Sequence, residues 1–310
     1  MTCSIVYVDA LTDLLRGVRA QGAQLCRSFA TPPWALRYVT DTPLMLVMIA
    51  GSGGWLVPDG REPMWLREGD VGLVRGPSGF VLADDPATPP QVDTSAAGCD
   101  QWQLGTRTYG LADDGEAVVI TGCYEVVGSV PDRLLSVLPR AFVVPNPDGP
   151  CPVLDLLKAE VGRDRPGQDT LLDRALDLML VAALREWFER PEANPPAWYA
   201  ALGDPVVGPA LRAIHDDPAR AWTVSELAAK ANVSRALLAK RFTAAVGVPP
   251  LTYLTQWRMA VAADLLAEPD ATVGSVARAV GYTDGFAFST AFKRVRGVRP
   301  SDHRVVALRA

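Results

Sequence analysis

The side chains with the clearest chemical pattern lie in two similar segments near the C-terminus. The first reads WTVSELAAKANVSRALLAKRFTAAVGVPP (residues 222–250) and the second reads ATVGSVARAVGYTDGFAFSTAFKRVRGVRP (residues 271–300). Helical spacing in the second half of each copy predicts a buried face made by Leu237, Leu238 and Phe242 in one and by Phe288 and Phe292 in the other. The side chains that then point outward are Arg235, Ala236, Ala239, Lys240 and Thr243, and in the second copy Gly285, Phe286, Ser289, Thr290 and Lys293.

These outward side chains suit contact with double-stranded DNA. A lysine such as Lys240 can donate hydrogen bonds to guanine O6 and N7, whereas an alanine methyl or the ring of Phe286 can lie against a thymine methyl. The charge balance agrees, because residues 203–310 hold 14 Lys and Arg against 9 Asp and Glu, although the whole chain has a net charge of -5. A basic part on an acidic protein indicates a polyanionic partner for that part alone.

Each copy predicts two helices joined by a tight turn, which is the helix-turn-helix unit. Ser234 and Asp284 stand where the second helix begins, and their side chains can accept hydrogen bonds from free backbone N–H groups. Between the copies, residues 249–268 predict a helical spacer of about 25 Å. Two recognition helices held apart in this way can enter successive turns of the major groove, which are about 34 Å apart.

Residue types needed for metal or nucleophilic catalysis are scarce. The two histidines are His215 and His303, so residues 1–200 cannot build a histidine metal centre, and no phosphate-binding loop or Ser/His/acid set is present. The sequence therefore predicts no cofactor, no metal and no enzymatic activity. Cysteines stand at positions 3, 26, 99, 123 and 151 with no CxxC spacing, which favours a reducing compartment.

The elements expected before residue 200 are of both kinds. Helical spacing over Val8–Ala20 predicts a short leading helix, and short apolar runs separated by turn residues over Trp34–Tyr124 predict an antiparallel β-sandwich or barrel. Helices are predicted over Asp132–Leu138, Val153–Val161 and Thr170–Arg190. The last is apolar around most of its circumference, so it is buried either inside its own domain or in a subunit interface.

With these patterns in place, residues 203–304 resemble the DNA-binding domain of the AraC/XylS family of bacterial transcription regulators. The resemblance is carried by WTVSELA, VSRALLAKRF, WRMAVAADLL, VARAVGYTD and FSTAFKRVRGVRP. It implies that Ala236, Ala239 and Lys240 face the bases and that Arg235 lies near the phosphates. The family commonly has arginine where this chain has Thr290, so the second copy is expected to read bases less strongly. Backbone contacts are expected from Arg294, Arg296 and Arg299.

The remainder of the chain resembles the cupin-type sensor domain of one branch of that family, through LCRSFATPPWALRY, GGWLV, LREGDVGLVRG and FVLADDP. This implies a signal sensed in the barrel. One form of the signal is a small molecule in the barrel mouth, and the candidate lining residues are Trp34, Tyr38, Met48, Trp55, Trp65, Phe80 and Tyr124. The alternative is a metal-independent cupin enzyme or ligand carrier with an appended DNA-binding domain.

Thiol oxidation is the second form that the signal can take. Some members of this cupin branch respond to reactive chlorine species through cysteine, and Cys26 matches one such position. Where the branch often has Cys-Gly in its last barrel strand, this chain has Thr121 before Gly122 and Cys123 after it. The displacement is expected to turn the Cys123 thiol to the opposite face of the strand. Arg27, the next residue after Cys26, is a candidate for lowering its thiol pKa.

The sequence thus predicts an α+β multidomain protein, with an N-terminal cupin-like antiparallel β-barrel flanked by helices and a C-terminal all-α double helix-turn-helix domain. The expected parts are residues 1–130 as the sensor barrel with its leading helix, 131–190 as a helical dimerisation region, 191–205 as a Pro-rich linker and 206–310 as the DNA-binding domain. We expect a cytoplasmic homodimer that binds promoter DNA, recruits RNA polymerase, answers to a small-molecule or oxidant effector and has no membrane partner. Activation is expected rather than repression, on the resemblance alone.

Overall fold

The computed structural model describes residues 15, 18–94, 102–110, 114–126, 134–146, 151–193 and 195–307. Contacts between residues divide the chain into two compact units, one made of 18–126 with 138–194 and the other containing 195–310. In the described part of the chain, no helix is both long and apolar enough to cross a membrane.

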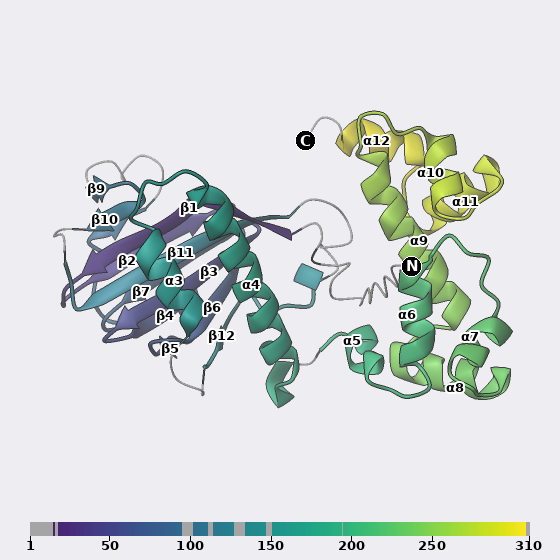
Figure 1. Ribbon diagram of the computed structural model, residues 1–310, viewed down its shortest axis with the longest axis horizontal. Coiled ribbons are helices and arrows are strands. Elements are labelled where there is room, and N and C mark those ends of the chain that lie inside the picture. The colour runs from purple at the N-terminus through teal and green to yellow at the C-terminus, as the bar shows by residue number, and fades with distance from the viewer. Residues whose placement is uncertain are drawn as a thin grey trace. The chain divides into compact units, whose positions relative to one another are not determined.

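The first unit contains two facing β-sheets (Figure 1). The larger sheet has the order β12-β6-β3-β11-β1-β10-β9, with strands at Ala141–Val144, Val71–Arg75, Leu44–Gly51, Ala117–Val126, Val18–Ala30, Thr108–Gly110 and Gln103–Gly105. The smaller sheet has the order β5-β4-β7-β2-β8, with strands at Met64–Leu66, Gly54–Pro58, Ser78–Ala83, Ala35–Thr40 and Val92–Asp93. Most neighbours run antiparallel, whereas the β1–β10 and β2–β8 pairs are parallel.

The alternation of side chains along β11 decides what each face of the larger sheet contacts. Val119 and Cys123 belong to the apolar cluster between the two sheets, together with Ile49, Phe80 and Leu82. On the other face of β11, a Cβ at Gly122 would lie 2.8 Å from the side chain of Leu176, and the Tyr124 hydroxyl donates a 2.7 Å hydrogen bond to the carbonyl of Leu176. One face of the sheet therefore forms the inner core, and the other lies against a helix.

That helix is α4 (Gln168–Phe188), which packs on β1 and β12 of the larger sheet and against the shorter helix α3 (Pro152–Glu160). Figure 1 shows α4 crossing the strands β1 and β11. Its buried residues include Leu172, Leu176, Met179 and Leu184, whereas Leu178 is 55% exposed on the side away from the sheet. The apolar composition predicted from the sequence is thus explained mainly by burial inside its own unit.

The second unit is helical. Its helices are α5 Ala197–Leu202, α6 Gly208–Asp216, α7 Val224–Lys230, α8 Arg235–Val246, α9 Pro250–Leu266, α10 Val273–Ala279, α11 Gly285–Arg296 and α12 Pro300–Ala307. Figure 1 shows α7 and α8 near one end of α9, and α10 and α11 near the other. Helix α9 buries Leu254, Trp257, Met259 and Leu266, because it contacts α8 of the first pair and both α10 and α11 of the second.

Three predicted elements differ from the structure. The leading helix over 8–20 lies mostly outside the described residues, and its last part, from Val18, begins strand β1 instead. In the predicted helix over 132–138, the described helical residues are Leu134 and Leu135. The predicted linker over 191–205 contains a 3-10 turn (Pro191–Ala193) and helix α5, which packs on α6 and α8 as part of the second unit. The prolines in this segment lie where helices begin, and they do not form an extended connection.

Candidate nucleic-acid interface and ligand cavity

The first helix of each copy begins with the same capping arrangement. The Thr223 hydroxyl accepts a hydrogen bond from the Glu226 N–H at 3.2 Å, while the Glu226 carboxylate accepts one from the Thr223 N–H at 2.9 Å. Thr272 and Ser275 repeat the pair in the second copy. Hydrogen bonds from Arg220 and Thr223 lower the pKa of Glu226 to about 2. Each reciprocal pair satisfies free N–H groups and fixes the residue at which the helix begins.

The turns between the helices also correspond. Asn232 and Gly281 both have positive φ, at 54° and 83°, which ends the first helix with a left-handed residue in each copy. A side chain at position 281 would overlap the carbonyl of Ala219, so glycine is required there. The predicted caps are confirmed, because the Leu237 N–H donates to Ser234 at 3.2 Å and the Phe286 N–H donates to Asp284 at 3.0 Å.

Helix α8 presents most of its predicted outward residues to solvent. Arg235, Ala236, Lys240 and Thr243 are exposed, and Ala239 is half-buried. Leu238 and Phe242 are fully buried, as the sequence predicts. Leu237 is not, because its side chain is 43% exposed. Leu238 and Phe242 are four positions apart and share a face, whereas Leu237 is about 100° away around the helix.

Helix α11 presents an aromatic ring and several cations. Phe286 is 80% exposed, Phe288 and Phe292 are buried, and Ser289 donates a 2.8 Å hydrogen bond to the carbonyl of Gly285. A surface groove runs along this helix to the start of α12, and we call it the α11 groove. Its walls are formed by Val273, Phe286, Ser289, Thr290, Lys293, Arg294, Arg299, Pro300 and Ser301. Arg296 is exposed on the same helix but lies outside the α11 groove.

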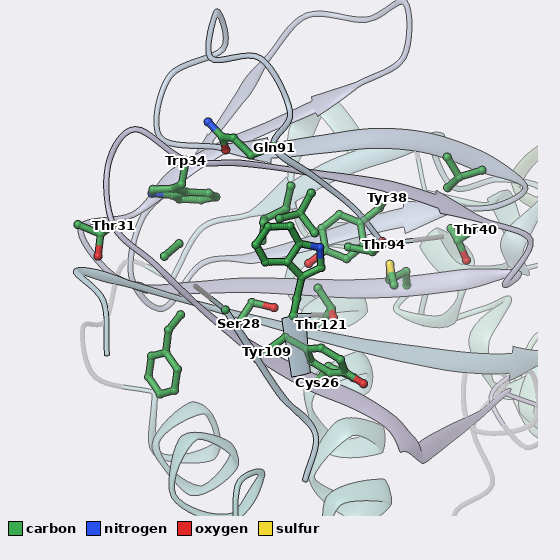
Figure 2. A pocket seen from close by; sticks show the side chains of 18 of the residues that line it. Cys26, Ser28, Thr31, Trp34, Tyr38, Thr40, Gln91, Thr94, Tyr109 and Thr121 are labelled. Carbon is green, nitrogen blue, oxygen red and sulfur yellow. The ribbon is translucent and has the colours of Figure 1, made fainter. Parts of the chain in front are cut away.

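A cavity of about 330 Å³ opens between the two sheets of the first unit. Its wall includes Cys26 and Ser28 from β1, Leu36 and Tyr38 from β2, and Thr121 from β11. The other residues that line it are Gln24, Phe29, Ala30, Thr31, Pro33, Trp34, Val39, Thr40, Met45, Gln91, Val92, Thr94, Trp102, Tyr109, Gly110 and Asp114. Figure 2 shows Ser28 and Thr121 on one side of this space and Trp34 and Tyr38 on the other.

Comparison with known proteins matches both units. The cupin family model covers residues 9–189, which is more than half of the chain, and a helix-turn-helix domain model covers residues 227–305. A Streptomyces lividans protein named as an AraC-like transcription regulator is 38% identical over 304 residues, which cover 96% of this chain and 98% of that protein. The chain belongs to the AraC family.

Other similar proteins carry related names. The HTH-type transcriptional regulator AlkR of Acinetobacter baylyi is 26% identical, over 96% of this chain and 99% of that protein. The DNA-binding domain of the transcriptional factor AdpA, solved with a target DNA, is 30% identical and covers 34% of this chain and 93% of that chain, with a TM-score of 0.31. The family membership and the names of the full-length relatives make this protein a DNA-binding transcription regulator rather than an enzyme.

The cavity of this regulator includes two of the seven predicted aromatic and Met candidates, Trp34 and Tyr38. Met48 is on the β3 face away from the inner cluster that holds Val47 and Ile49, and Tyr124 lies against α4. Phe80 stacks on Tyr38, its partner across β2 and β7, with ring centroids 5.0 Å apart, and it is not one of the residues that line the cavity.

The remaining two candidates, Trp55 and Trp65, form an edge-to-face pair between β4 and β5, outside the cavity lining. Polar lining residues were missed, above all Ser28, Gln91, Thr94 and Thr121. Because alternate residues of a strand share a face, Ser28 could have been found two positions after Cys26. Which face of each strand points inward depends on the pairing register, and a single sequence does not reveal that register.

The cysteines of the first unit lie differently from the prediction. Cys26 lines the cavity beside Thr121, its partner across the β1–β11 pair. Thr121 and Cys123 are two residues apart, so they share the inner face, and the predicted turn of Cys123 to the opposite face is wrong. Burial raises the pKa of the Cys123 thiol, although a hydrogen bond with Thr42 opposes the effect. All described cysteines are free thiols.

Arg27 also points away from Cys26. Its guanidinium Nε donates a 3.0 Å hydrogen bond to Thr108 Oγ1, and a Cβ at Gly162 would overlap the same guanidinium group. Successive side chains of a strand point to opposite faces. Arg27 therefore does not lie beside the Cys26 thiol. In the part of the chain that the structure describes, no group of three His, Cys, Asp or Glu residues could hold a metal ion.

Proposed function

We propose that this regulator is controlled by a small molecule that binds in the cavity between the two sheets, and that binding changes its occupancy of promoter DNA. The cavity itself is the observation that supports the proposal. Its volume of about 330 Å³ falls within the range of small-molecule sites, and its wall combines aromatic rings with a few polar groups. A core that only stabilised the fold would be filled, because protein interiors are packed to the density of organic crystals.

On the DNA side, we assign the two recognition helices different roles. Helix α8 carries Lys240 for guanine, Ala236 and Ala239 for contact with thymine methyls, and Arg235 for the phosphates. Helix α11 carries Phe286, Ser289 and Thr290 toward the bases. Phosphate contacts come from Lys293, Arg294 and Arg296, with Arg299 completing the α11 groove. In this assignment α8 is the stronger base reader, meaning that it contributes more to the recognition of specific bases. Helix α11 contributes more to the affinity that does not depend on DNA sequence.

We propose further that the regulator acts as a homodimer which activates transcription by recruiting RNA polymerase. Leu171 and Leu178 support self-association through α4, since both are exposed apolar residues on the side of the helix that faces away from its own sheet. The family most often activates, and the resemblance gives the direction of regulation. We expect the effector to change how the two DNA-binding units of the dimer are presented to the promoter.

The test is capture of sheared genomic DNA from the source organism by the purified full-length protein, followed by sequencing of the recovered fragments. We expect the recovered fragments to share a sequence motif. The genes next to each occurrence of the motif then identify the promoters that the protein binds. Capture in the presence of a small-molecule extract of the same cells, extracted with solvent and freed of protein, should change the recovered set. An unchanged set with a shared motif would contradict control by a small molecule but leave the DNA-binding assignment intact.

The same capture distinguishes thiol oxidation as the signal. Cys26 is half-buried in the wall of the cavity, so it is the described cysteine best placed to respond. Mild hypochlorous acid should leave the recovered fragments unchanged if the effector is a small molecule. A change that Cys26→Ser abolishes, and that Cys151→Ser does not, would replace the small-molecule proposal by a thiol sensor.

A further inference from the structure

The charged side chains around the cavity show which ligands can enter it. In the described residues that line the cavity, Asp114 is the one charged side chain, and it is exposed. The chain segments 95–101 (SAAGCDQ) and 111–113 (LAD) join lining residues to one another, and neither contains Lys, Arg or His. Neither the described lining nor these connecting segments can therefore supply a positive charge.

The remaining wall is aromatic, aliphatic or neutral and polar. Trp34, Tyr38, Trp102 and Tyr109 contribute aromatic rings, whose faces attract flat apolar molecules and also cations. Hydroxyl groups of side chains such as Ser28 and Thr121 can donate to or accept from neutral polar groups. An anion that entered this space would lose its water without gaining a counter-ion, which is strongly unfavourable.

We propose that the cavity binds an apolar aromatic compound that is uncharged or positively charged, and that it discriminates against anions. The inference rests on the proposed role of the cavity as the effector site and names the chemical class of the effector. The volume of about 330 Å³ stands at the lower end of the range for small-molecule sites, so a compound of about two fused rings is the expected size.

The experiment compares three compounds that share one ring system and differ in charge. These are 2-naphthalenemethanol (neutral), 2-naphthylmethylamine (cationic) and 2-naphthoate (anionic), each titrated into the full-length protein at pH 7 by calorimetry. We expect the alcohol and the amine to bind and the carboxylate to bind at least about tenfold more weakly. Tighter binding of the amine than of the alcohol is expected, since Asp114 is the one charged side chain in the described lining, and Asp114→Asn should remove that difference.

Variants that introduce a cation test the cause directly. Ser28→Lys places an ammonium group in the cavity wall and should reverse the order, so that the carboxylate binds more tightly than the amine. Gln24→Lys makes the same change at an exposed lining residue and is used if a lysine at the half-buried position 28 prevents folding. Ser52→Lys is the matched control, because it adds the same charge at an exposed turn residue outside the described lining.

The outcomes separate this inference from the proposed function. Binding of the carboxylate as tightly as the alcohol by the unaltered protein would overturn the inference, as would a reversal in Ser52→Lys equal to that in Ser28→Lys. If none of the three compounds binds, the aromatic class is wrong as well. Capture of specific DNA and its response to the cell extract are measured separately, so the proposed function can stand when the inference fails.

Discussion

The exposed ring of Phe286 leads to a quantitative prediction about DNA sequence. A phenylalanine side chain presents roughly 200 Å², and 80% of this one is exposed at the start of α11, which leaves about 160 Å² in water. If the major groove covers about a third of that area, the gain is about 1.3 kcal/mol at ~25 cal/mol per Å². The corresponding loss of a single thymine methyl should cost about 0.8 kcal/mol, or roughly fourfold in affinity.

The assay replaces one base at a time. Duplexes that carry the motif found by capture are prepared with each thymine changed in turn to uracil, which removes the methyl group and keeps the pairing. Fluorescence anisotropy at fixed salt then gives the affinity of the unaltered protein and of Phe286→Ala. We expect one or two positions where uracil weakens binding about fourfold in the unaltered protein and has no effect in the variant.

The control is Val295→Ala, which removes an exposed apolar side chain of the same helix that lies outside the α11 groove. It should retain the full effect of uracil at every position. If uracil weakens the unaltered protein and Phe286→Ala equally at all positions, the ring does not contact a thymine methyl. The exposure of Phe286 would then need another explanation.

Three further predictions concern the second unit. Lys240→Ala should weaken binding to the specific motif by about 1–3 kcal/mol relative to unrelated DNA, and equal losses on both DNAs in competition titrations would remove Lys240 from the base-reading set. The ordinary pKa of Glu226 is 4.5, and the fold lowers it to about 2. The ionised carboxylate of Glu226 therefore contributes fully to folding stability above about pH 4.5, and this contribution is lost as the pH falls toward 2. Glu226→Gln should unfold with a shallower pH dependence over that window in circular dichroism, and identical curves would contradict the capping role. A fragment of residues 195–310 should melt at a higher temperature than one of 203–310, because only the longer one keeps α5 against α8, and equal midpoints would show that α5 adds no stability.

Features fixed by neighbouring residues could be predicted from the sequence. Ser234 and Asp284 cap their helices as expected, because a cap depends on residues two or three positions away. Leu237 shows the limit of the same argument, since a hydrophobic residue next to a buried position in the sequence does not necessarily lie on the buried face of the helix. Only tertiary contact decides which part of a short helix is covered.

Features fixed by strand register could not be predicted. The register pairs Tyr38 with Phe80 across β2 and β7, and the sequence alone shows neither this pairing nor that Tyr38 lines the cavity while Phe80 does not. Val18 shows a related failure, because the apolar spacing of residues 8–20 fits a helix while pairing with Val126 makes its end a strand. In that case, pairing with residues more than a hundred positions away in the sequence determines the secondary structure, although the local spacing of apolar residues favours a helix.

The segment before the first helix-turn-helix pair is attached to the helix that we assign as the stronger base reader. Asp204 accepts hydrogen bonds from the N–H groups of Val206 and Val207 at 2.7 and 2.9 Å, which begins α6. Its other carboxylate oxygen accepts a 2.7 Å hydrogen bond from Arg241 on α8, and α5 packs against α8 as well. The segment after residue 195 therefore contacts α8 directly, both through helix α5 and through Asp204. Because Asp204 joins the start of α6 to Arg241 on α8, and α5 packs against both helices, this segment is a structural part of the DNA-binding unit rather than a loose connection.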